Sequence, residues 1–257
     1  MATGPAMIEA DVLSEARRML AGAESAGVPV RLLGGVAIAL RLAERLPAAL
    51  QRAIADIDFV TPRRAGRPVE DFLLAAGYEP NQAFNSMHGA RRLLFYDSPH
   101  RRQVDVFVGS FEMCHQIPLD ARLLLEPRTL PLAELVLTKL QILKLNAKDR
   151  NDLYALICAC AVGDRDGEMI NASQIAQLCA RDWGLYRTSM INLGRLRDEQ
   201  TDVQLSAPER ERLSIGIDRL RLAIETAPKS SRWKLRARVG DRVRWYEDPE
   251  EVEHGGY

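Results

Sequence analysis

The chain has 257 residues, of which 47% are hydrophobic and 27% are charged, and its 35 Lys and Arg balance 35 Asp and Glu. This is the composition of an ordinary globular protein that can bury a substantial core in one or two domains. The formal net charge of zero excludes the global positive field of a protein that coats DNA, so any nucleic-acid contact must come from local patches.

The sequence supports neither a membrane or secreted protein nor a protein held together by zinc or disulfides. No window approaches the roughly 18 uninterrupted apolar residues of a membrane span, and no basic stretch followed by a signal-type apolar run opens the chain. The four cysteines lie in apolar segments without the spacing of a zinc site or a disulfide framework, so we expect buried free thiols. We therefore expect a cytoplasmic protein with no membrane partner.

In chain order, the first half of the sequence alternates between helical and extended patterns. Apolar residues at helical spacing, and apolar runs bounded by Gly, Pro and other turn residues, predict three helices and four strands. The helices are expected over residues 8–25, 36–43 and 68–76, and the strands over 28–33, 56–60, 92–96 and 103–108. Turn-forming residues between the last two strands predict a hairpin there.

The second half of the sequence reads as helical. Apolar periodicity predicts helices over residues 132–146, 150–162, 173–183 and 208–226, the last of them capped by Ser206. Beyond them, apolar and basic residues alternate on both sides of Gly240-Asp241, which predicts a short basic β-hairpin. Its lysines and arginines alternate with Trp233 and Trp245, a pattern that suits either RNA binding or a sheet edge protected by charge.

These patterns together predict an α+β fold. A small mixed sheet flanked by helices comes first, a helical C-terminal module follows, and the short basic hairpin comes last. We expect the corresponding domains to be residues 1–130, 131–230 and 231–257, with an acidic tail at the end of the third.

The segment Ala55-Asp-Ile-Asp-Phe-Val60 holds two carboxylates one residue apart. Alternate side chains of a strand share a face, so Asp56 and Asp58 point together while the residues between and after them point into a core. Two like charges this close need a cation between them. Asp105, in a second apolar strand, supplies a third hard oxygen ligand for Mg²⁺ or Mn²⁺. The alternatives are a solvated strand end for the pair, and an ion pair with a nearby arginine for Asp105.

Gly34 and Gly35 close an apolar stretch roughly twenty residues before the two aspartates. Without side chains they let a phosphate approach the backbone closely, and the amides that open the following helix donate to an anion. The surrounding residues match neither a Walker loop nor a dinucleotide-binding fingerprint. The glycine pair therefore predicts a phosphate contact near Asp56 and Asp58.

These segments resemble a known superfamily. Leu33-Gly-Gly-Val-Ala-Ile-Ala-Leu-Arg41, the Asp56 segment and Val104-Asp-Val-Phe107 resemble the nucleotidyltransferases that share the DNA polymerase β-type palm. Residues 131–140 and 148–156 resemble the lysine and acidic motifs of the abortive-infection type nucleotidyltransferase toxins. The resemblance covers roughly residues 32–157 and departs from the superfamily where Val36 replaces a common serine.

The resemblance implies roles for particular residues. It implies that Asp56, Asp58 and Asp105 bind the metal, that Lys139 contacts the triphosphate, and that Asp152 lies near the site. A lysine extending from an amphipathic helix is the alternative interpretation of Lys139.

The resemblance also implies an activity. It implies a magnesium-dependent enzyme that moves a nucleoside monophosphate from a nucleoside triphosphate to an acceptor hydroxyl, with two metal ions roughly 3.5–4 Å apart. Acceptors in resembling families are tRNA, proteins and aminoglycosides, and a toxin-like member would have an antitoxin partner. Two alternatives stay open: a nucleotide-binding regulatory or interaction module without turnover, and an aminoglycoside-type nucleotidyltransferase for small molecules.

Overall fold

The computed structural model describes residues 8–248. It divides the chain into two compact units. Unit 1 is formed by Met1–Phe111 and Pro118–Leu135, and unit 2 by Glu112–Ile117 and Val136–Tyr257. The predicted domain ranges 1–130, 131–230 and 231–257 stay predictions.

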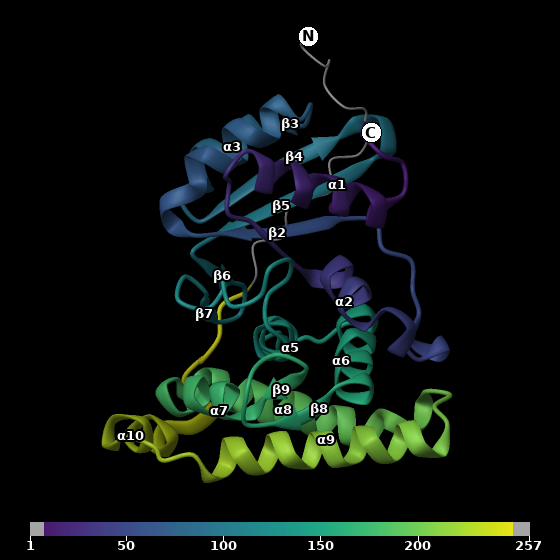
Figure 1. Ribbon diagram of the computed structural model, residues 1–257. Coiled ribbons are helices and arrows are strands. Elements are labelled where there is room, and N and C mark those ends of the chain that lie inside the picture. Colours follow the sequence, from purple (N-terminus) through teal and green to yellow (C-terminus); the bar gives the residue numbers. More distant parts are fainter. Residues whose placement is uncertain (1–7, 249–257) are drawn as a thin grey trace. The chain divides into compact units, whose positions relative to one another are not determined.

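Unit 1 is built on a mixed five-stranded sheet with the order β1-β2-β5-β4-β3 (Figure 1). Strands β2 and β5 run parallel, and every other neighbouring pair is antiparallel. The strands are β1 (Arg31–Leu33), β2 (Ile57–Thr61), β3 (Glu79–Pro80), β4 (Arg92–Asp97) and β5 (Arg102–Val108). The predicted small mixed sheet flanked by helices is therefore confirmed.

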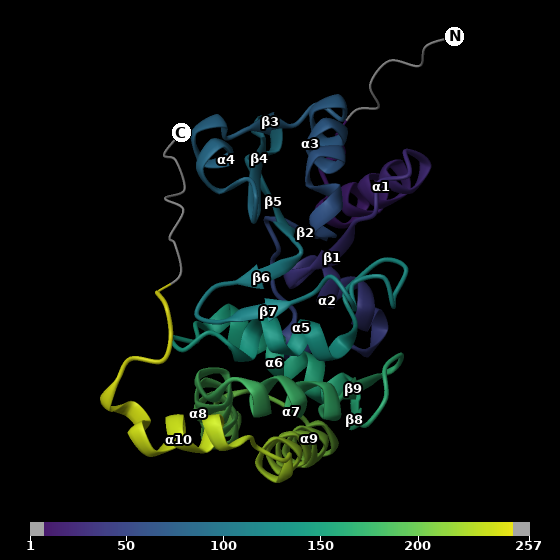
Figure 2. The same cartoon turned by 90° about the vertical axis from the view of Figure 1, so that its left-hand side faces the viewer.

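Helices cover both faces of this sheet. Figure 2 shows α1 and α3 on one side and α4 on the other. The face toward α1 and α3 is apolar, because Ile57 and Phe59 flank Asp58, Val104 and Val106 flank Asp105, and all four apolar residues are at most 2% exposed. The helices of unit 1 are α1 (Val12–Ser25), α2 (Gly34–Leu42), α3 (Gly66–Ala75) and α4 (Gln82–His88).

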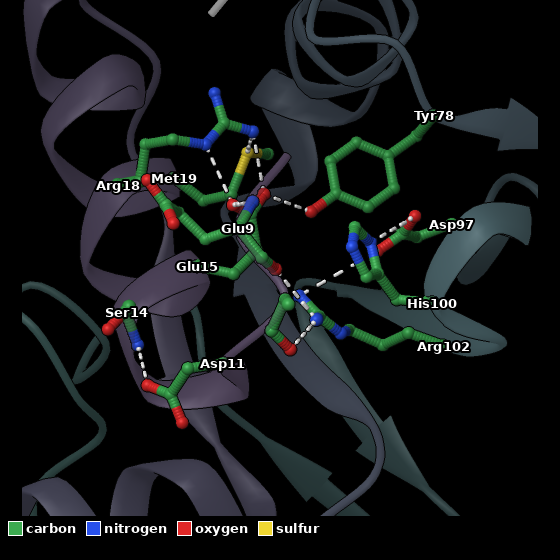
Figure 3. A network of polar contacts seen from close by, with 11 residues as sticks. Glu9, Asp11, Ser14, Glu15, Arg18, Met19, Tyr78, Asp97, His100 and Arg102 are labelled. Atoms are coloured by element: carbon green, nitrogen blue, oxygen red, sulfur yellow. Dashed lines mark hydrogen bonds and ion pairs between the residues drawn. The ribbon is translucent and has the colours of Figure 1, made fainter. Parts of the chain in front are cut away.

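A buried polar network joins α1 to the sheet (Figure 3). The carboxylate of Glu15 is fully buried and accepts a hydrogen bond from the hydroxyl of Tyr78. The guanidinium of Arg102, at the start of β5, donates to the carbonyls of Glu9 and Ala10 at 2.8 and 2.7 Å. Burial and the bond to Glu15 raise the pKa of Tyr78, so its hydroxyl stays a donor. These contacts fix α1 against the sheet, because a buried polar group without a partner is costly.

Unit 2 is mainly helical (Figure 1). Helix α5 (Leu132–Leu140) begins in unit 1 and continues in unit 2, and it is followed by α6 (Ala147–Ala159), α7 (Ala172–Arg181), α8 (Trp183–Glu199), α9 (Ala207–Thr226) and α10 (Ser231–Val239). The short strands of unit 2 are β8 (Ala161–Gly163) and β9 (Met169–Asn171), which pair with each other, while β6 (Ser110–Glu112) pairs with β7 (Gln116–Pro118) where the chain passes from unit 1 to unit 2 and back.

Two details explain how the longest of these helices is placed. Ser206 caps α9, as the sequence predicts, and forms a capping box in which its backbone amide donates to Glu209 at 2.7 Å. Gly216 lies where α9 meets α6, and a Cβ at this position would overlap with the side chain of Ile157. The glycine therefore permits the close approach of the two helices.

The predicted basic hairpin is wrong. The residues expected to form its first strand belong to helix α10, and Ser230 caps this helix by accepting a hydrogen bond from the amide of Trp233. The same residues also have helical periodicity, since Trp233 and Arg236 share a face: Trp233 donates to the carbonyl of Cys179 at 3.0 Å, and the guanidinium of Arg236 lies 4.3 Å from the ring centroid of Trp183. The predicted acidic tail beyond residue 248 lies outside the described residues.

Helix α8 was not predicted from the sequence. Its packed face contains Thr188, Ser189 and Asn192, all fully buried, so polar residues interrupt the apolar period on which the prediction depends. Asn192 fills this position by donating to the carbonyls of Leu140 and Ile142 at 2.9 and 2.7 Å. Asn192 thus occupies a core position because the carbonyls at and just beyond the end of α5 need hydrogen-bond donors.

The structure also gives the end of one predicted helix and the state of the cysteines. The helix predicted over residues 132–146 ends at Leu140, and Asn146 instead caps the next helix. The four cysteines are buried and free, as predicted. Across residues 8–248, every helix is too short or too polar to cross a membrane.

Candidate active site

Two of the predicted carboxylates lie side by side in unit 1. Asp58 on β2 and Asp105 on β5 are direct partners in the parallel register. Directly paired residues of neighbouring strands project from the same face of a sheet, so both carboxylates share the face opposite the apolar one. Asp56 lies just before β2, two residues ahead of Asp58, and is half-buried.

The carboxylate of Asp105 is buried and held at both oxygens. Its residue is only 4% exposed. The Nε of Arg92 donates to Oδ1 at 2.7 Å, and the Nε2 of Gln103 donates to Oδ2 at 2.7 Å. A buried anion requires such compensation, and the ion pair with an arginine that we gave as the alternative for Asp105 is present.

Arg92 is held in turn by aromatic rings. Its guanidinium carbon lies 5.2 Å from the ring centroid of Phe107 and 5.6 Å from that of Phe84. Phe107 is the direct partner of Arg92 across β4 and β5, and Phe84 comes from α4. These distances are those of cation–π interactions, so Arg92 has favourable contacts besides Asp105.

Gly34 is required by the position of Asp58. Gly34 opens α2 with a φ of +67°, a conformation that favours glycine. A Cβ on Gly34 would overlap with the Oδ2 atom of Asp58, so this carboxylate lies directly against the start of the helix. The positive end of the helix dipole therefore faces an anionic group.

Gly35 has a similar steric role. A Cβ on Gly35 would come within 2.6 Å of an Nη2 atom of Arg52 and 3.4 Å of a methyl of Ile54. The glycine pair thus accommodates both the chain that leads into β2 and the aspartate on that strand.

The other two predicted residues meet in unit 2. The ammonium of Lys139 on α5 lies 2.7 Å from an Oδ1 atom of Asp149 and 3.2 Å from an Oδ2 atom of Asp152, both on α6. The side chain of Lys139 is only 14% exposed, so it does not extend freely into solvent. The structure therefore brings Lys139 and Asp152 into contact, as an ion-paired cluster completed by Asp149.

Sequence reasoning missed three of these residues, for different reasons. Asp149 and Asp152 are three apart on one helix and so share a face, a signal that the sequence contains. Gln103 shares the face of Asp105 by strand alternation, which is also readable from the sequence. Arg92 reaches Asp105 only through the register of β4 against β5, which the sequence does not give.

The predicted residues thus gather in two places. Asp56, Asp58, Asp105, Gly34 and Gly35 belong to unit 1, and Lys139 and Asp152 belong to unit 2. Within residues 8–248, no group of three or more His, Cys, Asp or Glu side chains is arranged to hold a metal ion.

A small mixed sheet that presents two paired aspartates beside a glycine-initiated helix, followed by a helical C-terminal part, is consistent with the nucleotidyltransferase fold. The chain belongs to the uncharacterised nucleotidyltransferase family, whose sequence model matches residues 6–178. The match includes every predicted site residue and confirms the superfamily. Closeness to the abortive-infection toxins stays a prediction. Neither the curated proteins nor the solved structures contain a match to this chain.

Proposed function

We propose that this protein is a magnesium-dependent nucleotidyltransferase that moves a nucleoside monophosphate from a nucleoside triphosphate to an acceptor hydroxyl. One observation carries the proposal: Asp58 and Asp105 are direct partners on neighbouring parallel strands, and Asp58 lies against the glycine that opens α2. Carboxylates and a helix start in this arrangement offer metal ligands and phosphate donors at one place.

The residues that would hold the metal are Asp58 and Asp105, with Asp56 as the third ligand. Their donors are carboxylate oxygens, the hard ligands that Mg²⁺ and Mn²⁺ prefer. Each oxygen of Asp105 accepts one hydrogen bond and has remaining acceptor capacity, so Arg92 and Gln103 do not use it up. When bound, the metal supplies charge neutralisation at the reacting phosphate and its attacking and leaving oxygens.

The chain's own residues supply binding and a proton acceptor. The backbone at Gly34 and Gly35 lets the triphosphate approach the start of α2, where the helix dipole favours anions. The acceptor oxygen forms a bond to the α-phosphorus, the bond from this phosphorus to the bridging oxygen breaks, and pyrophosphate leaves. The hydroxyl proton passes to Asp105, which acts as the general base.

Lys139 is proposed as the contact for the triphosphate and Asp152 as a residue near it. The support is chemical: Lys139 is a largely buried ammonium held by two carboxylates, and such a group is costly unless it is paired. In the alternative interpretation, a lysine that extends into solvent from an amphipathic helix would not need two carboxylate partners.

Label transfer tests the proposal. The protein is incubated with Mg²⁺, each α-labelled nucleoside triphosphate, and pools of tRNA, protein or aminoglycoside. We expect transfer to one pool, and its loss in Asp58→Asn and Asp105→Asn. The matched control is Asp71→Asn, which changes an exposed aspartate of α3. Transfer that survives both site substitutions, or no transfer by the parent protein to any pool, contradicts the proposal.

The acceptor pool that takes the label decides between the acceptor classes. A toxin-like role with an antitoxin partner predicts label on tRNA and growth arrest when the protein is expressed, both abolished by Asp58→Asn. Label on aminoglycosides instead assigns the small-molecule alternative.

A further inference from the structure

We propose that this protein self-associates through unit 2, with the exposed face of α10 of one copy docked on the exposed face of α9 of a second copy. The two helices are consecutive in unit 2 (Figure 1), and their exposed faces carry opposite charges beside exposed apolar side chains. The inference is independent of the proposed function, because neither face contains a predicted site residue.

The exposed face of α9 is acidic and partly apolar. Its residues follow a heptad spacing: three acids are seven residues apart, and two apolar residues are also seven apart, namely Glu211, Asp218 and Glu225, and Ile215 and Leu222. At 3.6 residues per turn, all five lie on one stripe about four turns long. Ile215 is 47% exposed and Leu222 is 62% exposed, so the stripe presents apolar surface between its acids.

The arginines beside this stripe are bonded elsewhere. Arg212 and Arg219 donate to backbone carbonyls of unit 2 at 3.1 and 3.0 Å. Asp218 pairs with an arginine of α8 at 3.2 Å. Glu211 and Glu225 form no ion pair with any residue in the part of the chain that the structure describes. The stripe therefore keeps carboxylates that can pair with cations of another molecule.

The exposed face of α10 has the complementary pattern. One side of α10 packs on α7 and α8 through Trp233, which donates to the carbonyl of Cys179 and lies 5.0 Å from the ring of Tyr186. The opposite side holds two apolar residues flanked by three cations, all exposed: Leu235, Val239, Arg232, Lys234 and Arg238. Leu235 is 62% exposed and Val239 is 41% exposed. Within residues 8–248, none of these three cations has an ion pair.

The α9 stripe of a second copy matches both the charge and the apolar residues of this face. Acids on α9 meet cations on α10, and each face brings two exposed apolar side chains, so the two surfaces are complementary in the way that directs specific association. Two α10 faces would instead repel each other, because both are basic. A contact between two helix faces buries less area than a standard interface, so we expect the association to be weak and to weaken further as salt is added.

Other partners use this face less fully. A nucleic acid would pair with the cations but would gain little from Leu235 and Val239, and the ring of Trp233, which could stack on a base, is already packed against Tyr186. A lipid surface favours aromatic anchors beside the cations, and the exposed face of α10 has aliphatic residues in their place.

Charge reversal tests the inference, with the molar mass of the full chain measured by sedimentation at concentrations up to about 500 μM, the range in which weak complexes form. We expect the mass of the parent to rise above that of the monomer. The rise should be lost when α10 is reversed by Arg232→Glu with Arg238→Glu, and when α9 is reversed by Glu211→Arg with Glu225→Arg, because like charges then meet. The two reversed proteins should associate again when mixed, since every contact between them again joins opposite charges.

The matched control is Arg17→Glu with Arg64→Glu, which changes the net charge as much as the α10 reversal does, at two exposed positions of unit 1. It should associate like the parent, and circular dichroism checks that all variants fold. A monomeric parent overturns the inference, and so does association that survives either reversal or a mixture of the reversed proteins that stays monomeric. If the parent is monomeric and the α10 reversal abolishes its binding to tRNA or to anionic lipid vesicles, the face belongs to that ligand instead.

Discussion

Each unit of the molecule contains a cluster in which carboxylates meet a cation, and the two clusters are built in opposite ways. In unit 1 a carboxylate is central: Asp105 receives hydrogen bonds from Arg92 and Gln103 and lies beside Asp58. In unit 2 a cation is central: Lys139 is held by Asp149 and Asp152.

The two clusters differ in how readily their central charged group can bind a further ligand. The ammonium of Lys139 already has two carboxylate partners, so a phosphate must compete with both for it. Asp105 in unit 1 is bonded to a cation through one nitrogen, and each of its carboxylate oxygens retains acceptor capacity for a metal ion. Similar residues therefore do not mean similar chemistry, because the arrangement decides which ligand can bind.

The largest expected effect is that of Gly34→Ala in unit 1. The new Cβ overlaps with the carboxylate of Asp58 and is held at a positive φ, so we expect a loss of about 1–3 kcal/mol from crowding besides the backbone strain. Displacement of Asp58 by about 1 Å should reduce label transfer by about a hundredfold.

Gly27→Ala is the matched control for this substitution. Gly27 has a φ of +70° and no heavy atom within 4 Å of the new Cβ, so only the backbone strain of about 1 kcal/mol applies. Chemical denaturation and transfer rates compare the two variants. If both variants lose the same stability and keep the transfer rate of the parent, the position of Asp58 does not depend on Gly34.

Lys139→Met has the next largest effect and acts on unit 2. It leaves Asp149 and Asp152 buried without their shared cation, so we expect the free energy of unfolding to fall by about 3 kcal/mol. Urea denaturation measures this change, with Lys144→Met, at an exposed position, as the control. A loss equal to that of the control would mean that the cluster contributes nothing to the stability of unit 2.

We expect a smaller effect at Glu15 in unit 1. Its buried carboxylate accepts several hydrogen bonds, whereas Asp58 and Asp105 lie beside each other as a pair of carboxylates. Burial raises the pKa of Glu15, but hydrogen bonds from Arg18, Tyr78 and the amide of Glu9 outweigh it, so the folded pKa lies below the usual 4.5. Its stabilising contribution is therefore present above about pH 4.5 and is lost as the pH falls through the lower folded pKa.

Tyr78→Phe removes one of these donors. We expect it to cost about 1–2 kcal/mol at pH 7, and less at a pH below the folded pKa of Glu15, where the carboxyl is protonated in both states. Unfolding free energies at several pH values measure the difference. A cost that does not change with pH would contradict a role of Tyr78 in binding the ionised form of Glu15.

The sequence was sufficient to predict some features because they depend on local patterns. Strand alternation is local, so the burial of Ile57 on the face opposite Asp58 follows from the sequence. The cap at Ser206 is equally local. The predicted metal site requires Asp58 and Asp105 to lie close together, and their direct pairing on β2 and β5 agrees with this expectation.

Features that depend on contacts distant in sequence were not predictable in the same way. Arg92 reaches Asp105 through the register of two strands. The segment of α10 fits both a strand and a helix, and the packing of Trp233 and Arg236 on other helices accompanies the helical form. Helix α8 was missed because buried Asn192 satisfies carbonyls that only the folded chain brings to it.

The central claim is that Asp58 and Asp105 together form a metal site, and a Mn²⁺ titration in the presence of a nucleoside triphosphate tests it most directly. We expect the parent protein and Asp71→Asn to bind Mn²⁺ alike, and Asp58→Asn and Asp105→Asn each to weaken binding by at least about tenfold, since each removes a charged oxygen ligand. Equal Mn²⁺ affinity in all four proteins would contradict the claim.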